Sequence, residues 1–289
     1  MPDNQFSLGH LLSSLIKLAG LYLLVLLFAA VLTPVVFSML HPLNGKFGFE
    51  RIFDRLRYLG LLPCLPLIWN WAALRAGTVG WISLGWGRRK SALALLVLGA
   101  ASVLLLGVVL TNGLDRAVFP ENLPAVIGMG IVSALVICLL EEIIFRGILQ
   151  NYLSQNAGTC LGIMAASLLY AFLHGRPVAD GMEFQGWTGS FALVGLYLSG
   201  APSNLAPIVF VNLALLGIAL GIFYTRSRSL LLPMGLHFGI VAAAMPVAAI
   251  LRANDISSMD LLGGAYTTFM LMGWIILAII WPMRPVQPE

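Results

Sequence analysis

Two adjacent glutamates and an arginine follow a long apolar run in the stretch LLEEIIFRGIL, Leu139–Leu149. Residues 123–140 are 18 consecutive uncharged residues, and we expect both acids on the last turns of a helix that spans a membrane. Glu142 and Arg146 are four residues apart with the acid first, the favourable geometry for an ion pair along a helix. Glu141 points about 100° away from Glu142 and has no such partner.

A carboxylate without a partner at the edge of hydrocarbon is costly. Glu141 must therefore face water, a metal ion or an imidazole from another helix. The alternative is that the helix has already emerged into the head-group layer, where an acid pair and an arginine are ordinary.

Two histidines lie at or within later apolar runs. His174 ends the run LGIMAASLLYAFLH just before Gly175 and Pro177, where a capping or interfacial role would suffice. His237 lies about 10 Å of helical rise beyond Leu230. Histidine inside a membrane helix is rare enough to indicate a functional site.

Glu141, His174 and His237 together form a set that makes chemical sense. A buried glutamate can activate water as a general base, and imidazoles can hold a metal ion or stabilise an oxyanion. The set could hydrolyse an amide, or it could be the proton or cation site of a carrier. No inverted repeat or pair of interrupted helices is visible in the sequence to support a carrier.

The elements that must position these residues are membrane helices. The sequence is 60% hydrophobic and 10% charged, with a mean hydropathy of +0.95, which excludes an ordinary soluble domain. We predict an all-α polytopic transmembrane bundle of about eight helices, in one integral membrane domain over residues 1–289. The predicted spans are 18–39, 56–75, 91–111, 123–145, 158–174, 204–224, 230–251 and 261–281, with 187–199 as a candidate ninth.

The net charge of +4 does not indicate nucleic acid as a partner. The basic residues lie in the loops 46–57 and 75–90, where they can meet lipid head groups. Cys64, Cys138 and Cys160 lack pair spacing, so the sequence predicts neither a disulfide framework nor a thiolate metal site.

Three blocks in chain order resemble motifs of the CPBP (CAAX protease and bacteriocin-processing) intramembrane proteases, which are related to type II CAAX prenyl endopeptidases. EEIIFRG resembles the EExxxR signature, and YAFLH resembles the second motif, FxxxH, with Tyr170 in the aromatic place. GIALGIFYTRSRSLLLPMGLHF resembles the third block and carries His237. The resemblance covers residues 123–250, which we expect to form the catalytic core.

The resemblance implies an intramembrane endopeptidase that hydrolyses a peptide bond of a membrane-associated peptide or protein. By this resemblance Glu141 activates water beside His174 and His237, while Glu142 and Arg146 have a supporting role. The implied partners are membrane lipid and the substrate, and we expect an integral protein of a bacterial cytoplasmic membrane.

The resemblance leaves a metal ion open. Glu141, His174 and His237 are candidate ligands for Zn²⁺, but a glutamate that binds the metal is not at the same time a free base. We favour Glu141 as the base, with the histidines on the oxyanion side.

One position departs from the family pattern. The third motif normally continues with Asn or Asp four residues after its histidine, whereas here Val241 follows His237 and supplies no donor or ligand. Asn212 on the preceding helix is a candidate replacement, although asparagine on a membrane helix more often joins helices. The valine supports an alternative, a non-catalytic binding, immunity or regulatory protein of the same family.

Overall fold

The computed structural model describes residues 8–42, 48–60, 89–111, 117–175, 184–199, 206–257, 261 and 263–281. Every regular element in these ranges is a helix, and no described residue lies in a strand, so the all-α prediction is confirmed. The chain groups into two compact units, 1–77 with 175–205 and 78–174 with 206–289. Each unit has its own apolar core, and the single membrane domain stays a prediction.

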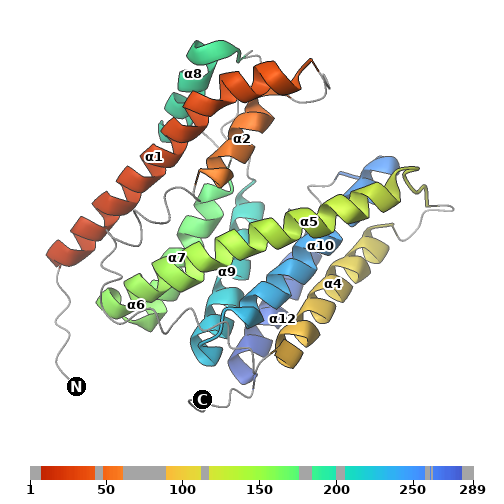
Figure 1. The fold of residues 1–289 in the computed structure, drawn as a ribbon. Coiled ribbons are helices and arrows are strands. Elements are labelled where there is room, and N and C mark those ends of the chain that lie inside the picture. The colour runs from red at the N-terminus through yellow and green to blue at the C-terminus, as the bar shows by residue number, and fades with distance from the viewer. Residues whose placement is uncertain are drawn as a thin grey trace. The chain divides into compact units, whose positions relative to one another are not determined.

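The first unit contains helices α1 (Leu8–Leu40), α2 (Phe49–Leu59) and α8 (Gly186–Leu198) (Figure 1). α1 includes a candidate membrane span that overlaps the predicted span 18–39. α2 is amphipathic and ends at Leu59, so the predicted span 56–75 lies mostly outside the described residues. α8 has 13 residues and corresponds to the candidate ninth span.

The second unit contains all the motif residues. Its elements are α4 (Arg89–Thr111), α5 (Leu123–Glu142), the π-helical segment η3 (Ile143–Gln150), α6 (Asn151–Ala157), α7 (Thr159–Leu173), α9 (Pro207–Ser227), α10 (Leu231–Ala253) and α12 (Ala265–Ile280). Within the described ranges, five helices of the whole chain are long and apolar enough to cross a membrane, four of them in this unit. α7 and α12, at 15 and 16 residues, are shorter apolar helices at two further predicted spans.

The helix that carries the two glutamates does not end where the sequence analysis placed its last turns. α5 continues through η3 into α6, and the apolar helical stretch runs over Leu123–Gln155. Gly147 is buried inside the π-helical segment, in keeping with the tolerance of membrane helices for glycine. The prediction that Glu141 and Glu142 lie on the last turns is therefore wrong, because both lie inside a longer helical rod.

α10 packs against α4 and α5, and its contact with α4 depends on two glycines (Figure 1). A Cβ atom on Gly235 would collide with the backbone oxygen of Ala92, and one on Gly239 with that of Leu96. Only glycine permits such a close approach of the two helix backbones. His237 lies two residues from Gly235 and two from Gly239. Two residues are about 200° around a helix, so the side chain of His237 points away from α4.

Candidate active site

Glu141, Glu142, Arg146, His174 and His237 all lie in the second unit, on α5, η3, α10 and the C-terminal cap of α7. The side chains of Glu141 and Glu142 are 2% and 0% exposed. Arg146 and His237 are equally buried, whereas His174 is partly exposed. The two acids therefore lie inside the helix bundle, whatever their depth in the membrane.

The carboxylate of Glu141 faces both imidazoles. Its Oε1 lies 3.7 Å from Nε2 of His174, and its Oε2 lies 3.8 Å from Nε2 of His237. Both separations are too long for a direct hydrogen bond. Within the described residues, the buried Oε2 of Glu141 has no hydrogen-bond partner. The site thus contains a buried carboxylate oxygen whose bonding capacity is unused.

Each histidine is oriented through its other ring nitrogen. Nδ1 of His174 donates to the backbone oxygen of Tyr170 at 2.8 Å, and Nδ1 of His237 donates to Oε1 of Glu142 at 2.8 Å. Carbonyl and carboxylate oxygens only accept, so each Nδ1 carries a proton. In its neutral form, each ring therefore turns the lone pair of Nε2 toward Glu141.

Glu142 does more than the sequence analysis predicted. Its Oε2 lies 3.4 Å from Nε of Arg146, so the expected ion pair is present. Its Oε1 accepts the proton of His237, a contact across 95 positions of the chain that helix spacing gives no sign of. Glu142 therefore joins η3 to α10 and fixes the orientation of the His237 ring.

Arg146 is held by aromatic rings and by α9. Its guanidinium carbon lies 5.1 Å from the ring centre of Tyr170 and 5.8 Å from that of Phe145. Nη2 donates to the backbone oxygen of Gly217 at 3.4 Å. A Cβ atom on Gly217 would lie 2.8 Å from Cβ of Ser167 on α7, so glycine lets α9 approach the site closely.

Two further residues reach the site that the sequence analysis did not assign to it. The hydroxyl of Tyr170 lies 3.4 Å from Nε2 of His237. The thiol of Cys138, also buried, interacts with the same histidine. Helical spacing could have indicated both, because Tyr170 precedes His174 by four residues and Cys138 precedes Glu142 by four.

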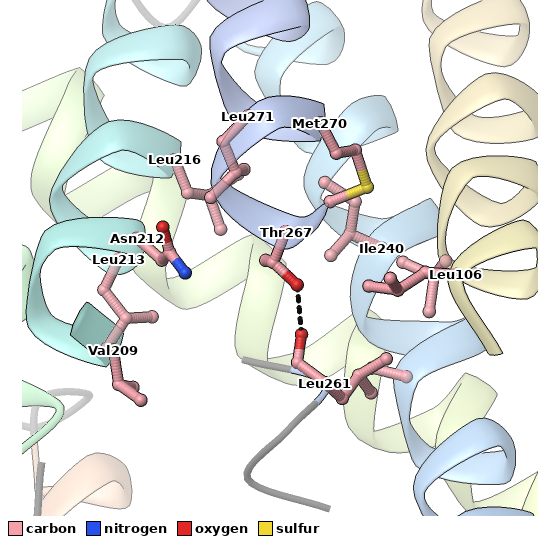
Figure 2. A pocket seen from close by; sticks show the side chains of 12 residues that line it. Leu106, Val209, Asn212, Leu213, Leu216, Ile240, Leu261, Thr267, Met270 and Leu271 are labelled. Atoms are coloured by element: carbon pink, nitrogen blue, oxygen red, sulfur yellow. Dashed lines mark hydrogen bonds between the residues drawn. The ribbon is translucent and has the colours of Figure 1, made fainter. Parts of the chain in front are cut away.

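Asn212 takes part in a contact between helices. Its Oδ1 accepts a hydrogen bond from Oγ1 of Thr268 at 2.8 Å, which joins α9 to α12. It also lines an apolar cavity of about 50 Å³ (Figure 2), which none of the candidate catalytic residues lines. The observed bond agrees with the more common role of asparagine in membrane helices. Val241 is half-buried and adds no polar group to the site.

The formal charges of the site do not balance when both acids are ionised. Two buried carboxylates stand against one guanidinium, so neutral histidines would leave one net negative charge in a medium of low dielectric. A proton on a histidine, a proton on one of the carboxylates or a bound cation would balance it.

The donor types present, one carboxylate and two imidazoles with anchored Nδ1 protons, are those that zinc takes. Among the described residues, however, no three His, Cys, Asp or Glu side chains have the arrangement of a formed metal site. The donor set therefore fits zinc by its chemistry, and the spacing in this structure is not that of a formed site.

Comparison with known proteins gives one family. Residues 123–243 match the family model described as type II CAAX prenyl endopeptidase Rce1-like. No curated protein and no solved structure matches the chain. The matched residues lie within 123–250, the range of the three sequence motifs, and they include all five motif residues of the site. The resemblance to the CPBP proteases is therefore confirmed at the level of the family.

Proposed function

Residues 123–243 match the Rce1-like family of type II CAAX prenyl endopeptidases, and on that premise we propose that this integral membrane protein is an intramembrane endopeptidase. Its substrate would be a peptide bond of a membrane-associated peptide or protein, and its location a bacterial cytoplasmic membrane. One observation carries the proposal: the buried carboxylate of Glu141 lies 3.7 and 3.8 Å from the imidazoles of His174 and His237.

In the proposed reaction Glu141 acts as the general base. Its carboxylate accepts a proton from water while the water oxygen bonds to the carbonyl carbon of the substrate, and the π electrons of the carbonyl move to its oxygen. The carbon–nitrogen bond then breaks, and the proton on Glu141 passes to the leaving nitrogen. The products are a carboxylic acid and an amine.

His174 and His237 line the side where the oxyanion forms. Since Nδ1 of His237 already donates to Glu142, Nε2 donates to the oxyanion only in the doubly protonated ring. Glu142 balances that charge and holds the ring in place, and Arg146 pairs with Glu142. This is the supporting role that we propose for Glu142 and Arg146.

Zinc is the cofactor that these residues would hold, with Glu141, His174 and His237 as ligands. When bound, it would act as a Lewis acid that polarises the substrate carbonyl and lowers the pKa of water. Glu141 would then be a ligand. We favour its role as a base, since its Oε2 accepts no hydrogen bond from the described part of the chain and is free to accept one from water.

Cleavage of membrane-anchored fluorogenic peptides by the purified, reconstituted protein tests the proposal. Glu141→Gln keeps the size of the side chain but removes its basicity, so we expect kcat to fall by about 10²- to 10⁴-fold. Glu121→Gln, at an exposed acid in the same unit, is the matched control and should cleave like wild type. Equal cleavage by Glu141→Gln and wild type would remove Glu141 from the mechanism.

A second candidate function follows from Val241, which supplies no donor one turn beyond His237. The protein would then bind a membrane partner without cleaving it, as an immunity or regulatory factor. A cellular phenotype that Glu141→Gln retains in full would support this function and contradict the protease.

A further inference from the structure

Tyr170 brings a buried hydroxyl to the candidate active site. The side chain is 1% exposed, and its hydroxyl has one hydrogen-bond partner in the described part of the chain, Nε2 of His237 at 3.4 Å. Because Nδ1 of His237 carries the proton shared with Glu142, neutral Nε2 can only accept, so the hydroxyl donates. The site therefore contains a neutral O–H donor.

The ring of Tyr170 is fixed by neighbours that do not touch the hydroxyl. Its centre lies 4.3 Å from that of His174 and 5.2 Å from that of Phe145, in an edge-on contact with the latter. The guanidinium of Arg146 covers the ring at 5.1 Å. A phenylalanine would make the same contacts, so packing does not require the hydroxyl.

The proposed reaction needs a donor that this hydroxyl can supply. Negative charge develops on the carbonyl oxygen, and fixed donors aimed at that charge are usually the largest electrostatic contribution to catalysis. His237 donates from Nε2 only when doubly protonated, and Val241 has no polar group. Arg146 pairs with Glu142, donates to Gly217 from Nη2 and lies against two rings, while its buried Nε and Nη1 donate no hydrogen bond to any described residue.

We infer that Tyr170 is a catalytic residue whose hydroxyl donates a hydrogen bond to the oxyanion of the tetrahedral intermediate. This inference rests on the proposed peptidase function. The bond to His237 is long for an O–H donor, so little is lost when the hydroxyl turns to the substrate. The hydroxyl of Tyr170 is thus a donor that does not depend on protonation of His237.

The position of Val241 provides a second way to supply the same donor. It follows His237 by four residues on α10, so the two side chains lie on one face of the helix. An asparagine at 241 would carry an amide donor one turn from the ring that Tyr170 contacts. The two positions are therefore expected to compensate for each other.

The experiment compares kcat and KM for wild type, Tyr170→Phe, Tyr170→Phe/Val241→Asn and Glu141→Gln. Tyr170→Phe should lower kcat by about 10²-fold, leave KM nearly unchanged and keep the unfolding temperature in detergent. The double variant should regain part of the lost kcat. Tyr266→Phe, at a tyrosine that is 62% exposed on α12, is the control and should match wild type.

Wild-type kcat in Tyr170→Phe, with Glu141→Gln inactive, would overturn the role of Tyr170 and leave the proposed function intact. Equal cleavage by Glu141→Gln and wild type, or no cleavage by wild type, would overturn both. No recovery in the double variant would overturn the compensation by position 241. If Tyr170→Phe unfolds, a fluorinated tyrosine at 170 replaces it: changed kcat in folded protein supports the inference, and unchanged kcat overturns it.

Discussion

Glu142 is the residue on which the geometry of the site depends most. One buried carboxylate pairs with Arg146 and also accepts the proton of His237. The ring that faces Glu141 is therefore oriented by the acid next to Glu141 in the sequence. The two acids, adjacent in the chain, have separate tasks because successive helical residues point in directions about 100° apart.

Glu142→Gln should destabilise the protein and reduce cleavage. It leaves the buried guanidinium of Arg146 without its acid partner, and breaking a buried pair from one side costs about 3–5 kcal/mol. The free energy of unfolding in detergent micelles measures the loss, with Glu121→Gln as an exposed control. In Glu142→Gln/Arg146→Met neither member of the ion pair is charged, so the double variant should be less destabilised than the sum of the single variants. A fully additive result would show that the pair does not couple.

Removal of divalent metal ions separates the two roles of Glu141. With Glu141 as a free base, we expect protein treated with a chelator to keep its cleavage activity. Elemental analysis of the same samples gives the zinc content per chain. Loss of activity and zinc together, restored by Zn²⁺ and not by Mg²⁺, would contradict this expectation. A lower zinc content in His174→Ala would then identify His174 as a ligand.

Among the elements, the sequence predicted those whose signal is local. The helices at 91–111 and 230–251 follow from apolar length, and their observed bounds are Arg89–Thr111 and Leu231–Ala253. The Glu142–Arg146 pair follows from spacing along one helix.

Features that depend on contacts between residues far apart in the chain could not be predicted from the sequence. The bond from His237 to Glu142 joins residues on two helices whose pairing no local pattern specifies. The continuation of α5 through η3 was missed because Gly147 reads as a turn signal in isolation. In the structure the residues on both sides of Gly147 in η3 are buried, and the helix continues into α6. For Tyr170 the motif identified the ring, and only the fold shows what the hydroxyl contacts.

The crossing of α4 and α10 should be sensitive to a single methyl group. In Gly239→Ala the new Cβ would collide with the backbone oxygen of Leu96, so the helices must separate, and overpacking of this kind costs about 1–3 kcal/mol. His237, two residues earlier on α10, would move with the helix, so kcat should fall together with the unfolding temperature. Gly128→Ala on α5 has open space around it and should be neutral or slightly stabilising. Equal stability of the two variants would contradict the close crossing.

At the scale of the molecule, large apolar side chains are exposed while the charged side chains of the candidate site are buried. This distribution fits a protein whose solvent is lipid. Large hydrophobic side chains are exposed along α4 and α5 of the second unit, among them Leu93, Val97, Leu105, Val108, Met129, Val132 and Leu135. In water such a surface would favour association, whereas in a bilayer it is the ordinary boundary with the acyl chains. Exposure on these helices therefore does not imply tolerance of polar substitution.

Val97→Asp tests this surface directly. Val97 is 56% exposed near the middle of α4, and in a soluble protein an aspartate there would change stability by about 0.5 kcal/mol or less. In a bilayer, an aspartate at the centre of a membrane helix costs about 2.5–3.5 kcal/mol. We therefore expect much less folded protein in the membrane fraction, measured by detergent extraction and size-exclusion chromatography, while Val97→Leu stays at the wild-type level. Wild-type yield of Val97→Asp would show that this face of α4 does not contact the acyl chains, since lipid offers the carboxylate no water.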